Sequence, residues 1–254
     1  MKPRLSQNFL FDPSILRRIA DAAGILPDDV VVEIGPGLGT LTKELLNRAG
    51  RVIAIEFDEK LYRALKEKED PGRFEIFHAD ALKFPYNELG QFKVVANIPY
   101  HITTPIIFRL LEEKGLRSMT LTIQKEVARR IAARPGGKDY GVLSLSVQYR
   151  GNPRIAFTIS KGAFRPVPKV DSACIRIDIY KKPPVQVQDE KLLFALIRGA
   201  FSQRRKTIEN GIKKLCSNPA EALKKAGIDP KSRPETMSMD EFARLSDEVG
   251  KLEQ

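Results

Sequence analysis

The sequence predicts an α/β fold in which a doubly wound parallel sheet precedes a small all-helical domain. Over the first 120 residues, short apolar runs alternate with helical patterns, as they do in βαβ units. Paired lysines and paired prolines at 181–184 indicate a linker, because adjacent prolines stop regular structure. Amphipathic helical patterns follow this linker. We therefore expect two domains, residues 1–182 and 183–254.

Each strand predicted for the sheet is a run of five or six mainly apolar residues, as is typical of buried parallel strands. In chain order these runs are Val30–Ile34, Arg51–Glu56, Phe74–Ala79, Phe92–Ala96 and Met119–Ile123. The segments between them carry leucine or isoleucine at helical spacing. They predict helices at Thr40–Ala49, Glu59–Lys68, Pro105–Glu113 and Lys125–Ala133. Ligands of such sheets bind beyond the carboxyl ends of the strands, so functional residues are expected there.

Two later segments, Ser144–Tyr149 and Ala173–Tyr180, are predicted as further strands. The second alternates apolar and polar residues, as an edge or antiparallel strand does. Beyond the linker, apolar residues recur at helical spacing. The predicted helices are Glu190–Phe201, Arg205–Leu215, Pro219–Ala226 and Asp240–Lys251.

The charge of the chain is strongly one-sided. It carries 43 Lys and Arg against 32 Asp and Glu, a formal net charge of +11. Residues 1–120 hold 17 basic and 17 acidic residues, so the whole excess lies after residue 120. Such an excess favours a polyanionic partner, a nucleic acid or an acidic membrane surface, over a solvated face without a partner.

The composition argues against several other classes of protein. Two cysteines and two histidines are too few for a disulfide framework and leave little for a zinc site, so no metal is expected. No run of 18 apolar residues and no signal-type segment is present, so we expect no membrane insertion and a cytoplasmic location.

A glycine-rich loop follows the first predicted strand and opens a helix. Its glycines, Gly35, Gly37 and Gly39, allow a tight turn and close approach of a ligand. Thr40 stands where a dinucleotide fingerprint needs glycine, and the Lys-Ser/Thr of a phosphate-binding loop is absent. The E-x-G-x-G-x-G pattern instead resembles motif I of methyltransferases that use S-adenosylmethionine (SAM). The alternative is a purely structural glycine turn.

Two acidic residues stand at the next strand ends. Glu56 ends the second strand, where a carboxylate can accept hydrogen bonds from both ribose hydroxyls of a nucleoside. Asp80 follows the third strand, where it can accept from the amino group of the cofactor's adenine. Either acid alone would be interpreted as a solvated loop residue. Their succession after the glycine loop favours a cofactor site.

The tetrapeptide Asn97-Ile98-Pro99-Tyr100 ends the fourth strand and fits the motif of amino-methyltransferases. The adenine amine is a poor nucleophile, and the Asn97 oxygen and the Ile98 carbonyl can hold its two hydrogens. Pro99 fixes the backbone, and Tyr100 can stack on the base, worth roughly 1–3 kcal/mol. Alignment and electrostatics, rather than a strong base, would then lower the barrier. A simple turn after a strand is the alternative interpretation.

These residues, with further segments along nearly the whole chain, resemble the KsgA-type family of small-subunit (16S) ribosomal RNA adenine dimethyltransferases. The resemblance extends over Leu5–Leu10, Gln124–Glu126, Phe164–Ser172, Ala200–Thr207, Ile228–Pro230, Arg233–Thr236 and Glu241–Phe242. It implies a Rossmann-like SAM-dependent methyltransferase sheet. It also implies that Asn8 and Leu10 contact SAM together with Gly35, Glu56, Asp80 and Asn97. Phe164 would stack on the target adenine opposite Tyr100. Ser6, where the family often has Gly, and Ile98, where Leu is commoner, are departures from its pattern.

The resemblance further implies the substrate. This would be two adjacent adenines in the loop of the 3′-terminal hairpin of 16S rRNA, each methylated twice at N6 within an immature 30S subunit. The enzyme is expected to act in ribosome assembly and to be a monomer. Exposed basic residues would hold RNA phosphates. Those expected are Arg129, Arg130, Arg165, Lys169, Arg204, Arg205 and Lys206.

Three other functions stay open at this point. The macrolide-resistance methyltransferases of 23S rRNA share the catalytic half but not the C-terminal segments. A non-catalytic RNA-binding or transcription factor could keep the fold, although the intact Asn97–Tyr100 motif argues against it. DNA adenine methylation fits the active-site chemistry but not the C-terminal segments.

Overall fold

The computed structural model describes residues 8–203 and 206–253. By its internal contacts the chain divides into two compact units. The first comprises residues 1–128 and 153–179, and the second comprises residues 129–152 and 180–254. Residues 129–152 therefore belong by contact to the second unit, whereas the sequence pattern placed the domain boundary at 182/183.

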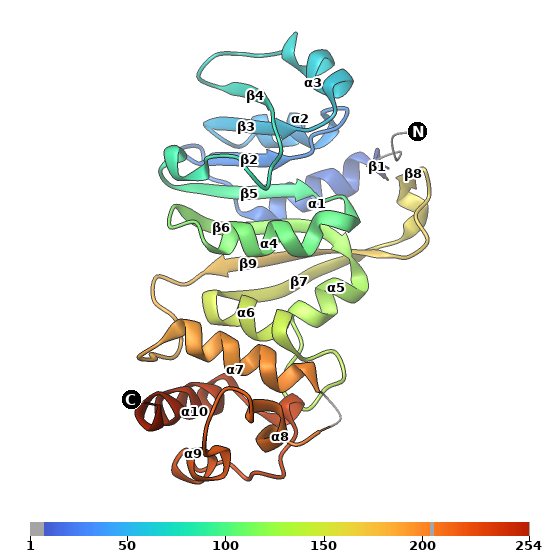
Figure 1. The fold of residues 1–254 in the computed structure, drawn as a ribbon. Coiled ribbons are helices and arrows are strands. Elements are labelled where there is room, and N and C mark those ends of the chain that lie inside the picture. The colour runs from blue at the N-terminus through green and yellow to red at the C-terminus, as the bar shows by residue number, and fades with distance from the viewer. Residues whose placement is uncertain (1–7, 204–205, 254) are drawn as a thin grey trace. The chain divides into compact units, whose positions relative to one another are not determined.

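The first unit is built on a mixed seven-stranded sheet, in the order β4-β3-β2-β5-β6-β9-β7 (Figure 1). The five neighbouring strands β4, β3, β2, β5 and β6 run parallel, and β9 pairs with β6 antiparallel. The strands are β2 (Val30–Ile34), β3 (Arg51–Glu56), β4 (Phe74–His78), β5 (Phe92–Asn97), β6 (Leu116–Gln124), β7 (Gly151–Ile159) and β9 (Ser172–Ile179). The five parallel strands and the antiparallel one predicted from the sequence are confirmed, with their ends shifted by at most three residues.

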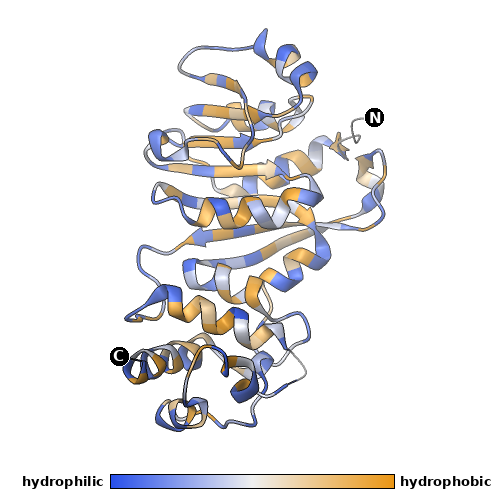
Figure 2. Cartoon of the chain, viewed as in Figure 1, coloured by the Kyte–Doolittle hydropathy of each residue, from blue (hydrophilic) through white to orange (hydrophobic). Residues whose placement is uncertain are grey.

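Helices pack on both faces of this sheet, because each parallel pair needs a crossover. In Figure 1, α1 lies behind the sheet and α4 in front of it. The helices are α1 (Pro13–Ala23), α2 (Thr40–Leu46), α3 (Glu59–Lys66), α4 (Thr103–Leu111) and α5 (Lys125–Ile131). The central strands are largely hydrophobic along their length (Figure 2), as burial on both faces requires. Short 3-10 helices, η1 (Tyr86–Leu89), η2 (Tyr100–Ile102) and η3 (Lys161–Ala163), complete this unit.

A separate two-stranded sheet joins the start of the chain to residues far along it. β1 (Phe9–Leu10) pairs antiparallel with β8 (Phe164–Arg165), in the register Phe9 opposite Arg165 and Leu10 opposite Phe164. Leu10 and Phe164 are both buried in one hydrophobic cluster of the first unit.

The prediction of a strand at Ser144–Tyr149 is wrong, because this segment lies within helix α6 (Val142–Arg150). Its alternating Leu-Ser-Leu-Ser pattern has the period of a strand, but the helix is buried nearly all round, so it has no polar face to reveal the helical period. The strand that follows, β7, was not predicted. It carries Pro153 and mostly exposed residues, as an edge strand tolerates.

The second unit packs helices around a core of its own. Its C-terminal helices are α7 (Glu190–Ser202), α8 (Ile208–Ile212), α9 (Pro219–Lys225) and α10 (Met239–Leu252), with the 3-10 turn η4 (Pro234–Thr236) between the last two. All four predicted helices are confirmed. The second was predicted at Arg205–Leu215, of which Arg205 lies outside the described residues, and α8 covers only the middle of this range. Gly211 lets α8 lie close to α7, because a Cβ there would come within 2.8 Å of the Ala200 Cα.

Candidate active site

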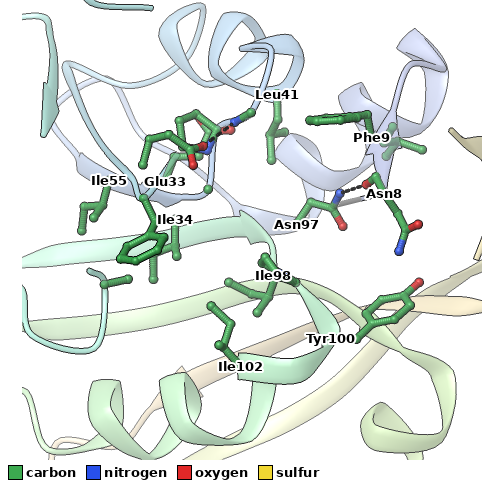
Figure 3. A pocket seen from close by; sticks show the side chains of 18 of the residues that line it. Asn8, Phe9, Glu33, Ile34, Leu41, Ile55, Asn97, Ile98, Tyr100 and Ile102 are labelled. Atoms are coloured by element: carbon green, nitrogen blue, oxygen red, sulfur yellow. Dashed lines mark hydrogen bonds between the residues drawn. The ribbon is translucent and has the colours of Figure 1, made fainter. Parts of the chain in front are cut away.

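A cavity of about 270 Å³ opens in the first unit at the carboxyl ends of the parallel strands. The loops after β2, β3, β4 and β5 all line it, and Asn8 to Leu10 form a further wall (Figure 3). The open-sheet rule predicts a ligand at this place, since strands of one direction end at one edge. Most of the predicted cofactor and catalytic residues come together here. They are Asn8, Leu10, Gly35, Gly37, Glu56, Asp80, Asn97, Ile98, Pro99 and Tyr100.

The glycine loop needs glycine for its backbone. Gly35, Gly37 and Gly39 have φ of 66°, 59° and 78°, in the left-handed region that side chains rarely adopt. A Cβ on Gly37 would come within 2.8 Å of the Phe9 ring. Gly39 does not line the cavity; it is the N-cap residue of α2, where a Cβ would approach Leu65 to 2.8 Å. Gly39 therefore determines the shape of the glycine loop and does not form part of the cavity surface.

Glu56 is held with its carboxylate against two backbone amides. One oxygen accepts from the Gly37 N–H at 3.1 Å and the other from the Asp58 N–H at 2.9 Å. The side chain is buried, and burial raises the pKa of this carboxyl group, an effect that these N–H groups oppose. Each carboxylate oxygen has a second lone pair, so Glu56 retains acceptor capacity toward the cavity.

The loops after β3 and β4 add an acid and an aromatic ring. Asp80 lines the cavity half-buried, and one of its oxygens accepts from the Leu82 N–H at 2.9 Å. Phe57 also lines the cavity, although 62% of it is exposed. Phe57 was not among the residues predicted for the site; a large apolar residue directly after the acidic end of a strand was the available signal.

Glu33, the acid of the E-x-G-x-G-x-G pattern, is a second buried acid at this site and had no predicted role of its own. The residue is 2% exposed, and its carboxyl group accepts from the Thr42 hydroxyl at 2.6 Å. Burial raises its pKa to about 8, with the neighbouring Glu56 charge adding to the rise. Glu33 therefore holds a proton at neutral pH.

The Glu33→Gln variant is expected to have a flatter dependence of stability on pH. In the folded protein Glu33 keeps its proton up to about pH 8, whereas its ordinary pKa is 4.5. The folded state thus binds more protons between these values, and the free energy of unfolding falls as pH rises through them, by up to about 1.4 kcal/mol per pH unit. The glutamine side chain does not titrate in this range, so the variant lacks this pH-dependent contribution.

Urea unfolding from pH 5 to pH 8.5 measures this difference. The exposed Glu67→Gln variant is the control and should keep the wild-type slope. Equal slopes for wild-type protein and Glu33→Gln would contradict the assignment of a protonated Glu33.

The Asn97–Tyr100 motif is fixed by contacts at its two ends. The Asn97 side-chain amide donates to the Asn8 carbonyl at 2.9 Å, drawn as a dashed line in Figure 3. The Ile98 N–H donates to the Thr122 carbonyl on β6 at 3.1 Å. The Tyr100 hydroxyl lies 2.7 Å from the Ser172 hydroxyl, and burial raises the pKa of this tyrosine. The motif is therefore held between the N-terminal segment and the end of the sheet.

Phe164 does not line the cavity. It is fully buried in β8, opposite Leu10, within the hydrophobic cluster of this unit. Its packing here is that of a core aromatic residue. Its expected stacking on the target adenine stays a prediction.

The residues expected to hold RNA are surface residues wherever the structure describes them. Arg129, Arg130, Arg165, Lys169 and Lys206 are exposed, which leaves their cationic groups accessible. Arg204 and Arg205 lie outside the described residues. Within the described part of the chain there is no group of three or more His, Cys, Asp or Glu side chains that could hold a metal ion. Nor does any described helix have the length and apolarity to cross a membrane.

Comparison with known proteins places this geometry in a family. The model of the ribosomal RNA adenine dimethylase family matches residues 1–251. The chain belongs to this family. A relative from Clostridium acetobutylicum, "Ribosomal RNA small subunit methyltransferase A", is 49% identical over 97% of this chain and 92% of its own. The protein of the same name from Clostridium perfringens strain SM101 is 48% identical over 97% of this chain and 90% of its own.

Solved structures agree with the family. A dimethyladenosine transferase from Plasmodium falciparum superposes with a TM-score of 0.84 at 27% identity, covering 96% of this chain and 98% of its own. The 23S rRNA methyltransferase ErmE superposes with a TM-score of 0.75 at 28% identity, covering 96% of this chain and 100% of its own. The predicted Rossmann-like methyltransferase fold, the family and the enzyme class are thereby confirmed.

Proposed function

We propose that this protein is a SAM-dependent enzyme that dimethylates N6 of two adjacent adenines in the loop of the 3′-terminal hairpin of 16S rRNA. One observation carries the proposal: the Asn97 amide nitrogen is bound to the Asn8 carbonyl at the wall of the cavity. This bond fixes the orientation of the Asn97 amide and uses one of its two N–H donors, which leaves the Asn97 Oδ1 to accept a hydrogen bond. The names of the relatives include the ribosomal RNA of the small subunit, which supports the choice of substrate.

The residues of the cavity fit SAM. Glu56 keeps free acceptor lone pairs that suit two ribose hydroxyls, and Asp80 suits the adenine amino group. The left-handed Gly35 and Gly37 leave the backbone open to close approach. Leu10 and Asn8 close the same cavity. SAM supplies an electrophilic methyl group bound to a sulfonium sulfur. When the methyl group is transferred, the sulfur becomes a neutral thioether and is the leaving group.

Asn97 and Ile98 would hold the target amine. The Asn97 Oδ1 and the Ile98 carbonyl accept its two hydrogens, which favours a pyramidal nitrogen with its lone pair free to attack. Pro99 fixes the carbonyl, and the Tyr100 ring supplies a stacking surface. Each transfer leaves a cationic nitrogen, which releases one proton to water. After the first methylation the nitrogen keeps one hydrogen, so one acceptor can still orient it for the second. A base in a hairpin loop costs less to extrude than one in a duplex.

The basic second half of the chain supports a ribosomal partner. In this proposal residues 1–182 bind SAM and catalyse, and residues 183–254 bind rRNA. Phosphate contacts come from Arg129, Arg130, Arg165, Lys169, Arg204, Arg205 and Lys206. The substrate is an immature 30S subunit in the cytoplasm, and the enzyme acts as a monomer in ribosome assembly.

Methylation of 30S particles that lack the dimethyladenines tests the function directly. With radiolabelled SAM we expect label in 16S rRNA, and mass spectrometry should place four methyl groups on two adjacent adenines of the 3′-terminal hairpin. Immature particles should accept label better than free 16S rRNA. Particles from a strain that retains its dimethyladenines are the control and should take up none.

Intact 50S subunits and 23S rRNA provide the discriminating arm of the same assay. Resemblance to ErmE makes 23S rRNA the second candidate substrate. If label appears in 23S rRNA alone, 23S rRNA and not 16S rRNA is the substrate. Absence of label from every particle and RNA would contradict the proposed activity.

A further inference from the structure

The hydroxyl group of Tyr100 is bound at a place that the proposed chemistry does not use. It lies 2.7 Å from the hydroxyl of Ser172, which is fully buried and does not line the cavity. The two residues are 72 positions apart in sequence. Tyr100 begins the short helix η2, whereas Ser172 begins β9. The contact therefore connects the catalytic loop to a strand of the central sheet.

Ser172 is held rigidly by its own surroundings. It stands opposite Gln124 at the end of the β6–β9 ladder. The preceding residue, Asp171, accepts from the Lys125 N–H through its carbonyl at 3.0 Å and from the Lys161 N–H through its carboxylate at 3.1 Å. These bonds fix the backbone on which the Ser172 hydroxyl stands. A fixed partner at the far end of the Tyr100 side chain determines the direction of its ring.

Tyr100 needs such a partner, because its backbone hydrogen bonds do not set the direction of its side chain. It belongs to a 3-10 helix of three residues and is only half-buried. A ring that stacks on a base must keep its plane, and a tyrosine ring moves about two torsion angles. A hydrogen bond at the hydroxyl restricts both torsions at once. Burial also raises the pKa of Tyr100, so the phenol remains able to donate.

We propose that Ser172 is a positioning residue, whose hydroxyl holds the Tyr100 ring in the orientation that receives the target adenine. The proposal rests on the proposed function, because it needs Tyr100 to contact the base. Ser172 touches neither the base nor the cofactor cavity, and so it acts through Tyr100. If Ser172 acts in this way, the loss of the Ser172 hydroxyl and the loss of the Tyr100 hydroxyl should have the same effect on catalysis.

A double-mutant cycle on the full-length enzyme tests this, with 30S particles lacking the dimethyladenines as substrate. Ser172→Ala, Tyr100→Phe and the double variant are compared with wild type. We expect each single variant to lower kcat/KM for the particle about three- to tenfold, the effect of one hydrogen bond, with the loss in kcat. The double variant should lose no more than either single one. The KM for SAM should not change.

Controls separate positioning from folding. Ser118→Ala removes another buried hydroxyl from the same sheet and should leave kcat unchanged. Ser172→Thr keeps the hydroxyl and should retain more activity than Ser172→Ala. Thermal unfolding reports whether each variant folds. If Ser172→Ala does not fold, Tyr100→Phe still tests the hydrogen bond from the other side.

The outcomes also separate this inference from the function on which it rests. Wild-type kcat/KM in Ser172→Ala or Tyr100→Phe, or effects that multiply in the double variant, would overturn the positioning role. Tyr100→Ala removes the ring together with the hydroxyl, so its comparison with Tyr100→Phe isolates the stacking role. If Tyr100→Ala is as active as wild type, the stacking itself is refuted; if it is inactive while Tyr100→Phe is fully active, only the role of Ser172 fails.

Discussion

The Asn97→Ala variant is expected to lose methyl transfer by about 10²- to 10³-fold in kcat, the size of effect seen when one preorganised polar contact is removed from a reacting centre. The change removes the oxygen proposed to accept from the target amine and the amide that binds the Asn8 carbonyl at 2.9 Å. Single-turnover methylation of 30S particles measures it. Binding of the particle should be largely intact, because the phosphate contacts lie elsewhere.

Asn152→Ala is the matched control, since this asparagine is exposed and does not line the cavity. It should methylate at the wild-type rate. Unchanged turnover in Asn97→Ala would refute the proposed mechanism. A parallel loss of turnover and particle binding would instead indicate a structural role for Asn97.

The Glu56→Gln variant is expected to bind SAM about ten- to 100-fold more weakly, the effect of losing about 1.5–3 kcal/mol in charge-assisted hydrogen bonds. The geometry explains why so small a change matters. Each carboxylate oxygen already accepts from one backbone N–H, of Gly37 or Asp58. The amide nitrogen of glutamine must face one of these donors, so the loop has to shift.

Isothermal titration with SAM measures this effect, and Glu67→Gln, exposed at the end of α3, is its control. The control should bind as wild type does. An affinity in Glu56→Gln within twofold of wild type would remove Glu56 from the proposed cofactor site. Unfolding of the variant without ligand shows whether the loop shift also costs stability.

Much of the site could be predicted because its residues stand at strand ends. Glu56 and Asn97 end β3 and β5, and the sheet topology brings those ends to one edge. A local pattern was enough for each of these residues, since one strand and one loop determine its place.

Contacts between distant segments could not be predicted in the same way. The bond between Tyr100 and Ser172 depends on the register of β9 against β6, which no local pattern encodes. The burial of Phe164 depends likewise on its pairing with Leu10 across β1 and β8. The strand predicted at Ser144–Tyr149 failed for a related reason: burial of α6 by its neighbours removed the polar face that marks a helix.

The pairing of β1 with β8 has a consequence for how the enzyme is made. Phe9 meets Arg165, a residue synthesised 156 positions later, while the Asn8 carbonyl meets Asn97. The bond to Asn97 becomes possible once residue 97 is made, whereas the strand pairing of Phe9 and Leu10 must wait for Phe164 and Arg165. The N-terminal wall of the cavity therefore gains its full set of contacts only late in translation. Each new molecule should thus gain its cofactor site at nearly the same moment as the last strands of its sheet.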